Sequence, residues 1–194
     1  MGHYTDAPED NLLGITTHQA LNEAEALGVA RAEFFLTELN YPLRVTTTFL
    51  RELHRVAFAH LYDWAGTWRT TTPNVGTYVP PAPARVPQLM YEFEDDLRFR
   101  MSATAADNPD EVARLLAFAH HRLVFIHPFT NGNGRTARLL TNALAYNYGF
   151  AEVVLYQREA GSSRSSYLQA IRLGDHEGPR ALALLIRQQL RPLA

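Results

Sequence analysis

The chain has 194 residues, of which 46% are hydrophobic and 20% charged, and its formal net charge is -2. These values are typical of a single soluble globular domain and exclude a disordered chain or a strongly basic nucleic-acid binder. Because there is no Cys, a disulfide framework and a thiolate zinc site are excluded as well. No apolar run has membrane-spanning length, and residues 1–11 carry no signal-peptide pattern. We therefore expect a cytoplasmic protein with no nucleic-acid and no membrane partner.

Most of the chain has the apolar spacing of amphipathic helices. Thr17 is a good N-cap for the first helix, and Asn108-Pro109 is a good start signal for the fourth. The first helix should end by Tyr41-Pro42, because a residue before proline is disfavoured in helical geometry. The predicted helices cover approximately residues 18–39, 47–62, 86–101, 109–126, 135–146, 163–173 and 178–190.

One segment between the second and third helices has a different pattern. Residues 64–87 combine strand-favouring Trp, Thr, Tyr and Val side chains with turn formers at Pro73-Asn74 and Gly76. We expect a short β-hairpin there. The sequence therefore predicts an all-α fold with one hairpin, organised as a polar tail over residues 1–16 and a single domain over residues 17–194.

The most informative stretch is residues 126–138, IHPFTNGNGRTAR, which joins the end of one predicted helix to the start of the next. Gly132 and Gly134 lack a Cβ, so the backbone can bend and approach a ligand closely. The N–H groups at the start of the following helix favour an anion. The loop therefore predicts a phosphate-binding site.

Three side chains beside this loop add charge and proton-transfer chemistry. Arg135 and Arg138 project from nearly the same helix face, and cations at a helix N-terminus are unfavourable unless an anion offsets them. His127 lies just before a turn-forming proline, and an imidazole can accept a proton near neutral pH. A base, an anion site and two guanidinium groups are typical of phosphoryl or nucleotidyl transfer, in which catalysis is largely positioning and charge stabilisation.

This stretch resembles the signature of the Fic family, H-P-F-x-[D/E]-G-N-G-R-x-x-R. Residues 63–70, DWAGTWRT, are similar to the segment before the family's flap hairpin, and residues 167–179, YLQAIRLGDHEGP, are similar to its penultimate helix and turn. The resemblance covers approximately residues 45–190 and implies a Fic-like helical bundle with a hairpin flap. The N-terminal ITTHQALNEAEAL is similar to the subgroup known as mobile mystery protein B.

The resemblance implies a protein adenylyltransferase, which moves AMP from ATP to a Ser, Thr or Tyr hydroxyl of a target protein. His127 would deprotonate that hydroxyl, Phe129 would anchor the loop in the core, and Arg138 would assist catalysis through the γ-phosphate. The implied nucleotide-binding residues are Asn131, Gly132, Asn133, Gly134, Arg135 and Arg138. The implied target-docking residues of the flap, which would bind by strand addition, are Thr70, Thr71, Thr72, Val75, Gly76 and Tyr78.

One position departs from the signature. Most active members carry Asp or Glu where this chain has Asn131, and that carboxylate holds a divalent cation. An amide oxygen can coordinate Mg²⁺ or Mn²⁺ but brings no negative charge, so the implied metal site at Asn131 is weakened. Two alternatives therefore stay open: a nucleotide-binding regulatory or interaction module with weak or lost transfer activity, and transfer of a different phosphate-containing group.

Family members are often restrained by a helix with the pattern [S/T]-x-x-x-E-[G/N], whose Glu pairs with the second Arg of the signature. Glu23 and Glu25 lie in a suitable N-terminal helix, although neither follows a Ser or Thr at the required distance. Both are candidate inhibitory residues. An antitoxin or another inhibitory partner protein is the alternative form of restraint.

Two other nucleotide-binding patterns fit less well. Residues 132–137 match G-x-G-x-x-A, and Glu152 stands in the region where a ribose-binding acid would be expected. The preceding segment reads as a helix, whereas the dinucleotide fingerprint needs a strand. A P-loop is excluded because every basic residue is Arg and the chain has no Lys.

Other residues have simpler interpretations. Trp64 and Trp68 are expected to pack in the core and beside the flap, and Arg69 is expected to be a surface or ion-pairing residue. Six further histidines are expected to be structural or solvated; they are His18, His54, His60, His120, His121 and His176.

Overall fold

The computed structural model of the protein describes residues 9–76, 78–155 and 162–193; residues 1–8 of the predicted tail lie outside this range. The predicted all-α class is confirmed. In the described part of the chain, pairing between extended segments is limited to two isolated bridges, Val75–Tyr78 and Phe150–Pro192. None of its helices is both long and apolar enough to cross a membrane. The helices are α1 His18–Thr37, α2 Thr47–Phe58, the short 3₁₀ helix η1 Pro83–Arg85, α3 Val86–Ala103, α4 Pro109–Ile126, α5 Asn133–Asn147, α6 Ser162–Glu177 and α7 Arg180–Arg187.

The starts of α1 and α4 follow the predicted capping residues. The Thr17 hydroxyl accepts a hydrogen bond from the N–H of Ala20 at 3.3 Å. The Asn108 side chain accepts from the N–H groups of Asp110 and Glu111 at 3.1 and 3.2 Å. These N–H groups have no acceptor within their helices, so the local sequence determines where α1 and α4 begin.

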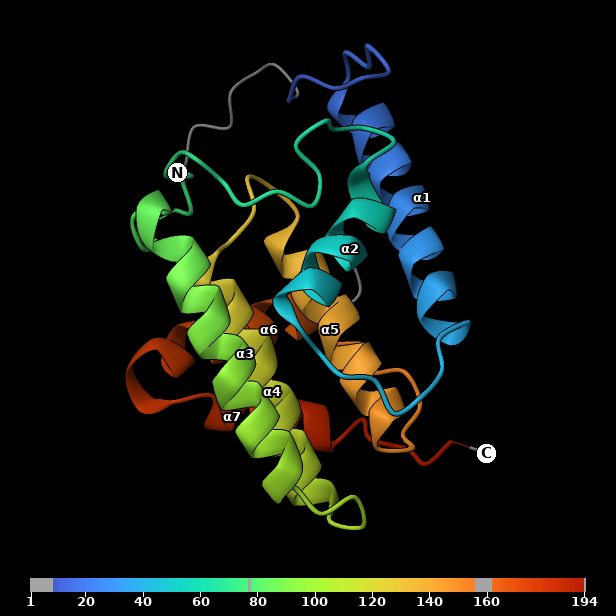
Figure 1. Ribbon diagram of the computed structural model, residues 1–194, viewed down its shortest axis with the longest axis vertical. Coiled ribbons are helices and arrows are strands. Elements are labelled where there is room, and N and C mark those ends of the chain that lie inside the picture. Colours follow the sequence, from blue (N-terminus) through green and yellow to red (C-terminus); the bar gives the residue numbers. More distant parts are fainter. Residues whose placement is uncertain (1–8, 77, 156–161, 194) are drawn as a thin grey trace.

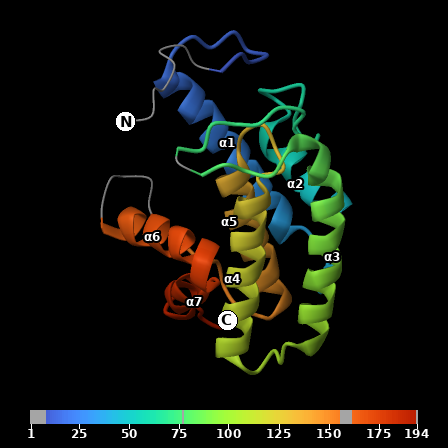
Figure 2. The same ribbon diagram turned by 90° about the vertical axis from the view of Figure 1, so that its left-hand side faces the viewer.

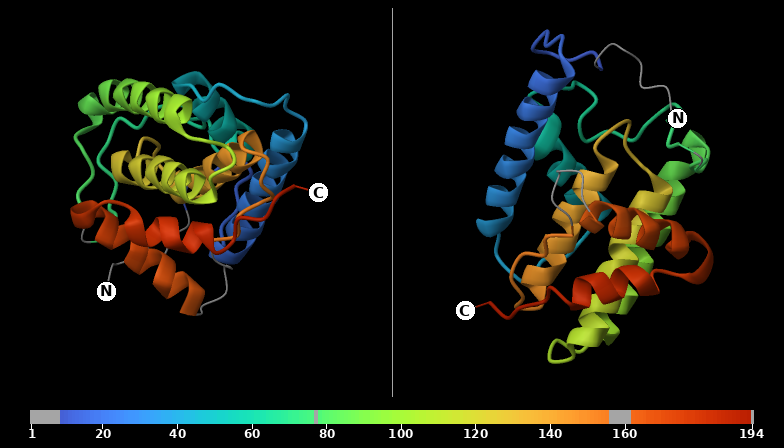
Figure 3. Two further views of the ribbon diagram at one scale, coloured as in Figure 1. Left: turned by 90° about the horizontal axis from the view of Figure 1, so that it is seen from below. Right: turned by 180° about the vertical axis from the view of Figure 1, so that it is seen from behind.

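The helices are arranged in layers with α4 and α5 in the middle. Helices α6 and α7 cover one side of this pair, and α2 and α3 lie on the other side (Figures 1, 2 and 3). Helix α1 packs against α2 and α5. Leu140 and Leu144 of α5 belong to the core cluster shared with α3, α4, α6 and α7, whereas Leu139 and Ala143 belong to the cluster shared with α1 and α2. Helix α5 is therefore held from both sides, and its N-terminus is a rigid platform.

A buried histidine ties α4 to α5 and α6. The Thr141 hydroxyl donates to the carbonyl of Ala137 at 2.8 Å, so it accepts from Nδ1–H of His120 at 2.9 Å. Nε2 of His120 then accepts from the Tyr167 hydroxyl at 2.8 Å. Burial lowers the pKa of His120 to about 3, which keeps the ring neutral. His120 is thus a structural residue, as expected.

The segment predicted to form the hairpin contains a tight turn. The carbonyl of Val75 accepts from the N–H of Tyr78 at 3.1 Å, and the two residues form an antiparallel bridge. Proline at positions 73 and 80 removes N–H groups that a longer ladder would need. The flap is therefore a minimal hairpin, and residues 70–72 leading into it are exposed.

Candidate active site

The loop between α4 and α5 bends at Gly132, which precedes α5 with a left-handed φ of 79°. A Cβ there would lie 2.6 Å from the ring of Phe58, so both backbone and packing require glycine. A Cβ at Gly134 would meet only Nη1 of Arg138, at 3.7 Å. The open side beside Gly134 lies in the first turn of α5, where N–H groups have no acceptor in the helix and attract an anion.

The loop is anchored from below by Phe129 and Asn133. Phe129 is fully buried, as the resemblance implies. The Asn133 side chain accepts from the N–H of Phe129 and donates to its carbonyl, both at 2.8 Å. Asn133 was expected to line the phosphate site, but its amide is buried in this internal contact. Only the main chain of Asn133 can therefore contribute to ligand binding.

His54 supports the loop from α2. Its ring stacks on Phe129 with centroids 3.8 Å apart. Nδ1 of His54 accepts from the N–H of Gly66 at 3.0 Å, so Nε2–H donates to the carbonyl of Asn131 at 3.0 Å. Burial lowers the pKa of His54 to about 4. The neutral ring thus connects α2, the Gly66 turn and the glycine loop.

His127 ends α4 in a left-handed conformation, with φ 53° and ψ 57°. Among the described residues it is the one non-glycine with positive φ, and such backbone strain is typical of functional positions. Nδ1 of His127 lies 3.2 Å from the carbonyl of Val124. Because a carbonyl can only accept, Nδ1 carries the proton and Nε2 keeps its lone pair. Burial lowers the pKa of His127, and the charge of Arg69 lowers it further, so the ring has the protonation state of a general base.

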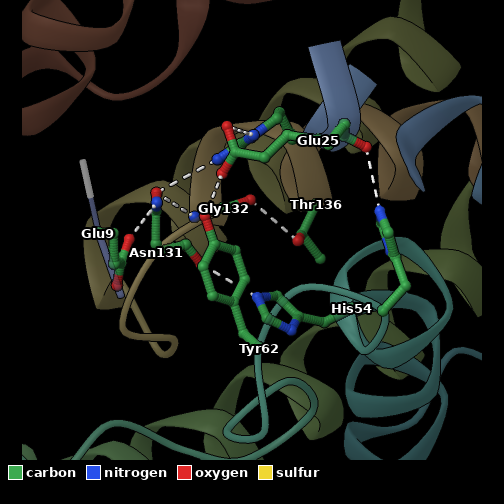
Figure 4. A network of polar contacts seen from close by, with 10 residues as sticks. Glu9, Glu25, His54, Tyr62, Asn131, Gly132 and Thr136 are labelled. Carbon is green, nitrogen blue, oxygen red and sulfur yellow. Dashed lines mark hydrogen bonds and ion pairs between the residues drawn. The ribbon is translucent and has the colours of Figure 1, made fainter. Parts of the chain in front are cut away.

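Arg135 is paired with a carboxylate from the N-terminal helix. Nη1 of Arg135 lies 2.7 Å from Oε2 of Glu25, and its guanidinium lies over the ring of Phe58 at 4.7 Å. Glu25 is 6% exposed and also accepts from the Tyr62 hydroxyl at 3.0 Å. Figure 4 shows Glu25 and Tyr62 converging on the glycine loop. The carboxylate of Glu25 therefore lies at the predicted anion site.

The two candidate inhibitory residues differ in placement. Glu23 is exposed on α1, and its carboxylate accepts from the side chain of Gln19. Glu25 contacts Arg135, the first Arg of the signature, whereas the inhibitory pattern of the family involves the second. Arg138 is half-buried, and its Nη1 borders the open side of the loop at Gly134.

Asn131, the candidate metal ligand, is engaged by hydrogen bonds on both sides of its amide. Oδ1 accepts from the N–H of Gly132 at 2.6 Å and lies 3.3 Å from Nη2 of Arg135, and Nδ2 donates to Glu9 at 2.7 Å. Burial raises the pKa of Glu9, and the charge of Glu25 raises it further. In the part of the chain that is described, no three His, Asp or Glu side chains are grouped to hold a metal. This arrangement does not fit a protein-held cation, since the Asn131 oxygen faces two N–H donors and one of them is cationic.

Sequence reasoning missed three side chains at the site: Glu9, Tyr62 and Arg69. The expectation that Arg69 is a surface or ion-pairing residue was wrong. Arg69 is 3% exposed, and its Nε donates to the carbonyl of His127 at 2.6 Å. The carbonyls at the end of α4 need donors, and this buried cation supplies them. The sequence signal that could have indicated this role is the position of Arg69 just before the flap.

Trp64 and Trp68 do pack as expected, Trp64 on Tyr62 and Trp68 beside Phe129.

These features define a helical domain in which a neutral histidine and an anion-binding helix N-terminus share one loop. The Fic/DOC family model matches residues 44–145, which is more than half of the chain. The chain therefore belongs to the Fic/DOC family.

Several relatives carry the name Protein adenylyltransferase Fic. The protein from Nematostella vectensis is 32% identical over 175 residues, which are 89% of this chain and 39% of that protein. The protein from Drosophila willistoni is 35% identical over 153 residues, which are 78% of this chain and 29% of that protein. The chain thus spans well under half the length of these relatives.

Solved structures share the fold. BepC from Bartonella tribocorum with bound AMPPNP has a TM-score of 0.80 at 18% identity and covers 98% of this chain and 96% of that chain. Residues 134–508 of Fic-1 from C. elegans give a TM-score of 0.70 at 28% identity and cover 86% of this chain and 48% of that chain.

Two alanine substitutions should separate the fold of the loop from ligand binding. Gly132→Ala forces a left-handed alanine against Phe58, so we expect the free energy of unfolding to fall by about 1–2 kcal/mol or more. Gly134→Ala places a methyl in open space within a helix, so stability should be unchanged or up to about 1 kcal/mol higher. That methyl should nevertheless weaken ATP binding, because it lies on the open side of the loop, where the phosphates are expected to bind. Urea denaturation and calorimetric titration with ATP measure the two effects.

Gly149→Ala is the matched control for the backbone strain. Gly149 has φ 74°, and a Cβ there would meet no atom within 4 Å, so this variant bears the left-handed strain without a clash. It should bind ATP as the wild type does. Wild-type ATP affinity in Gly134→Ala would show that the open side of the loop does not hold phosphates.

Proposed function

We propose that the protein is an adenylyltransferase that transfers AMP from ATP to a Ser, Thr or Tyr hydroxyl of a target protein. One observation carries the proposal: the hydrogen bond to Val124 leaves Nε2 of His127 with a lone pair, at one end of a loop whose other end is an open helix N-terminus with two Arg residues. Membership of the Fic/DOC family and the names of the relatives support the same activity.

In this reaction, Nε2 of His127 accepts the proton of the target hydroxyl. The hydroxyl oxygen forms a bond to the α-phosphorus of ATP, the bond from that phosphorus to the bridging oxygen breaks, and pyrophosphate leaves. The first N–H groups of α5 and the guanidinium groups of Arg135 and Arg138 offset the negative charge of the phosphates. Nη1 of Arg135 lies 2.7 Å from Glu25, so the phosphates compete with that carboxylate for the guanidinium.

The flap would present the target hydroxyl. Residues 70–72 are exposed and lead into the turn at Val75, Gly76 and Tyr78, so their backbone groups can pair with an extended target segment. The hydroxyl of Tyr78 donates to the carbonyl of Phe125 at 2.6 Å, which ties the flap to the end of α4. The target would therefore be held close to the helix that carries His127.

The finer assignments rest on the resemblance. Membership of the mobile mystery protein B subgroup, a bacterial origin and an antitoxin partner are part of the proposal for this reason, and the cytoplasmic setting expected from the sequence is part of it as well. Any Mg²⁺ or Mn²⁺ that enters the site would be held mainly by the phosphates of ATP, since Asn131 offers a neutral oxygen already bonded to Gly132.

His127→Ala should slow transfer strongly while ATP binding remains. We expect the rate of AMP transfer to fall by roughly 10²–10⁴-fold, the usual contribution of general base catalysis. Mass spectrometry of the protein and of a cell lysate incubated with ATP and Mg²⁺ or Mn²⁺ measures the AMP adduct. His176→Ala, which changes an exposed histidine outside the site, is the control and should transfer AMP at the wild-type rate.

An AMP adduct that forms in His127→Ala at the wild-type rate would remove His127 as the base. The engaged amide of Asn131 favours one second candidate function, a nucleotide-binding module without transfer. Thermal stabilisation of the wild type by ATP, with no adduct on any protein, would support that function instead.

We also propose that Glu25 restrains nucleotide binding. Its carboxylate forms an ion pair with Arg135, which the phosphates of ATP would also bind. The side chains of Glu25 and Arg135 are only 7% and 20% exposed. Because solvent screens such a pair weakly, the carboxylate competes effectively with an incoming anion. The first Arg of the signature is therefore the restrained one in this chain.

Glu25→Gln should increase ATP affinity by about tenfold, the equivalent of about 1.4 kcal/mol, because it removes the negative charge that competes with ATP for Arg135. Calorimetric titration gives the dissociation constant for ATP. Glu23→Gln removes the same charge from the exposed face of the same helix and should leave the affinity unchanged. Equal ATP affinity in the two variants would contradict the proposed competition.

A further inference from the structure

The guanidinium of Arg69 binds backbone carbonyls from two parts of the site. Nε donates to the carbonyl of His127 at 2.6 Å, and Nη2 lies 3.5 Å from the carbonyl of Ile126. On the flap side, Nη1 donates to the carbonyl of Thr71 at 2.9 Å and Nη2 to that of Pro81 at 2.6 Å. Thr71 and Pro81 stand at the two ends of the flap. One side chain thus connects both ends of the flap with the turn at His127.

The end of α4 explains why a buried cation is stable there without a carboxylate. The last carbonyls of a helix have no N–H partner within the helix and carry partial negative charge. Two of these carbonyls accept from Arg69, while that of Val124 accepts from the His127 ring and that of Phe125 from the Tyr78 hydroxyl. No ion pair within the described ranges includes Arg69. The helix end therefore takes the place of a counter-ion.

The main chain of the same segment adds a further contact. The N–H of Arg69 donates to the carbonyl of Pro128 at 2.9 Å, directly after His127. Arg69 thus contacts the carbonyls of three successive residues of the turn, Ile126, His127 and Pro128. Lysine cannot replace this pattern, because an ammonium group lacks the planar array of five N–H donors in a guanidinium.

We propose that Arg69 is a positioning residue for the general base, which holds the strained turn at His127 and both ends of the flap in one fixed arrangement. The flap and Nε2 of His127 are then set relative to each other by a single side chain. A target segment docked on the flap is brought into register with the proton acceptor. This role rests on the proposed function, since it concerns the transfer of the target proton.

Two substitutions test the geometry and the charge of Arg69 separately. Arg69→Lys keeps the charge but loses the array of donors, so we expect kcat for AMP transfer to fall roughly 100-fold, the effect of a misplacement of about 1 Å. The KM for ATP should stay within about twofold of the wild-type value, because the contacts of Arg69 with the glycine loop end at Pro128. Burial is the main cause of the lowered pKa of His127, and Arg69→Gln removes the charge that lowers it further, so that pKa should rise.

The pKa and the tautomer of His127 are measured by NMR titration of ¹⁵N-labelled histidine. In the wild type we expect a proton on Nδ1, and in both Arg69 variants a second population with the proton on Nε2. When kcat of Arg69→Gln is measured against pH, the acidic limb of the curve should shift to higher pH together with the titration of His127. A merely structural role would leave the tautomer unchanged in any variant that folds.

Arg51→Lys is the matched control. Nε of Arg51 also donates to a backbone carbonyl of the same segment, that of Gly66 at 2.7 Å, and its guanidinium lies 5.6 Å from the ring of Trp68. Among the described residues it forms no hydrogen bond to the flap or to His127. It should transfer AMP at the wild-type rate. If Arg69→Gln fails to fold, Tyr78→Phe removes a single donor to the end of α4 and should lower kcat on the order of tenfold, with a smaller shift in the tautomer population.

The outcomes separate this inference from the proposed function. The titration of His127 needs no transfer, so it can be read even from a protein that forms no AMP adduct. A wild type without transfer would overturn the proposed function alone. An unchanged tautomer in Arg69→Lys and Tyr78→Phe, with kcat equal to that of Arg51→Lys, would overturn the role of Arg69.

Discussion

The hydrogen bond from Nδ1 of His127 to the carbonyl of Val124 is the interaction on which the site depends. A carbonyl can only accept, so this one contact decides which ring nitrogen is free to take a proton. It forms because the chain leaves α4 in a left-handed conformation, which turns the ring back over the last turn of its own helix. The strain at His127 is therefore the structural origin of the base, and the donors at the end of α4 hold it in place.

The second constraint is the charge of the glycine loop. Two guanidinium groups near a helix N-terminus are unfavourable without an anion, and the chain supplies one from Glu25 on α1. Glu9 adds a second carboxylate through Asn131. The raised pKa of Glu9 is the consequence of burial and of the neighbouring charge of Glu25. These carboxylates, which stabilise the loop, are thus the groups that the phosphates of ATP have to displace.

The helices and the loop could be predicted from local sequence, because capping, apolar spacing and glycine geometry act over a few residues. Thr17 and Asn108 are caps, and Gly132 is left-handed as its type allows. The partners of these elements could not be predicted. Arg69 and His127 are separated by 58 positions in the sequence, and Glu9 and Asn131 by 122. Contacts between residues so far apart produce no pattern in the local sequence. The inward amide of Asn133 was missed for a similar reason, since the signature gives a residue type but not the direction of its side chain.

A crystal structure with a non-hydrolysable ATP analogue tests the central claim most directly. We expect the triphosphate at the first turn of α5, Arg135 separated from Glu25 and bonded to phosphate oxygens, and Nε2 of His127 facing the α-phosphate with Nδ1 still bonded to Val124. A nucleotide bound elsewhere, or bound while His127 points away from its phosphates, would contradict this account.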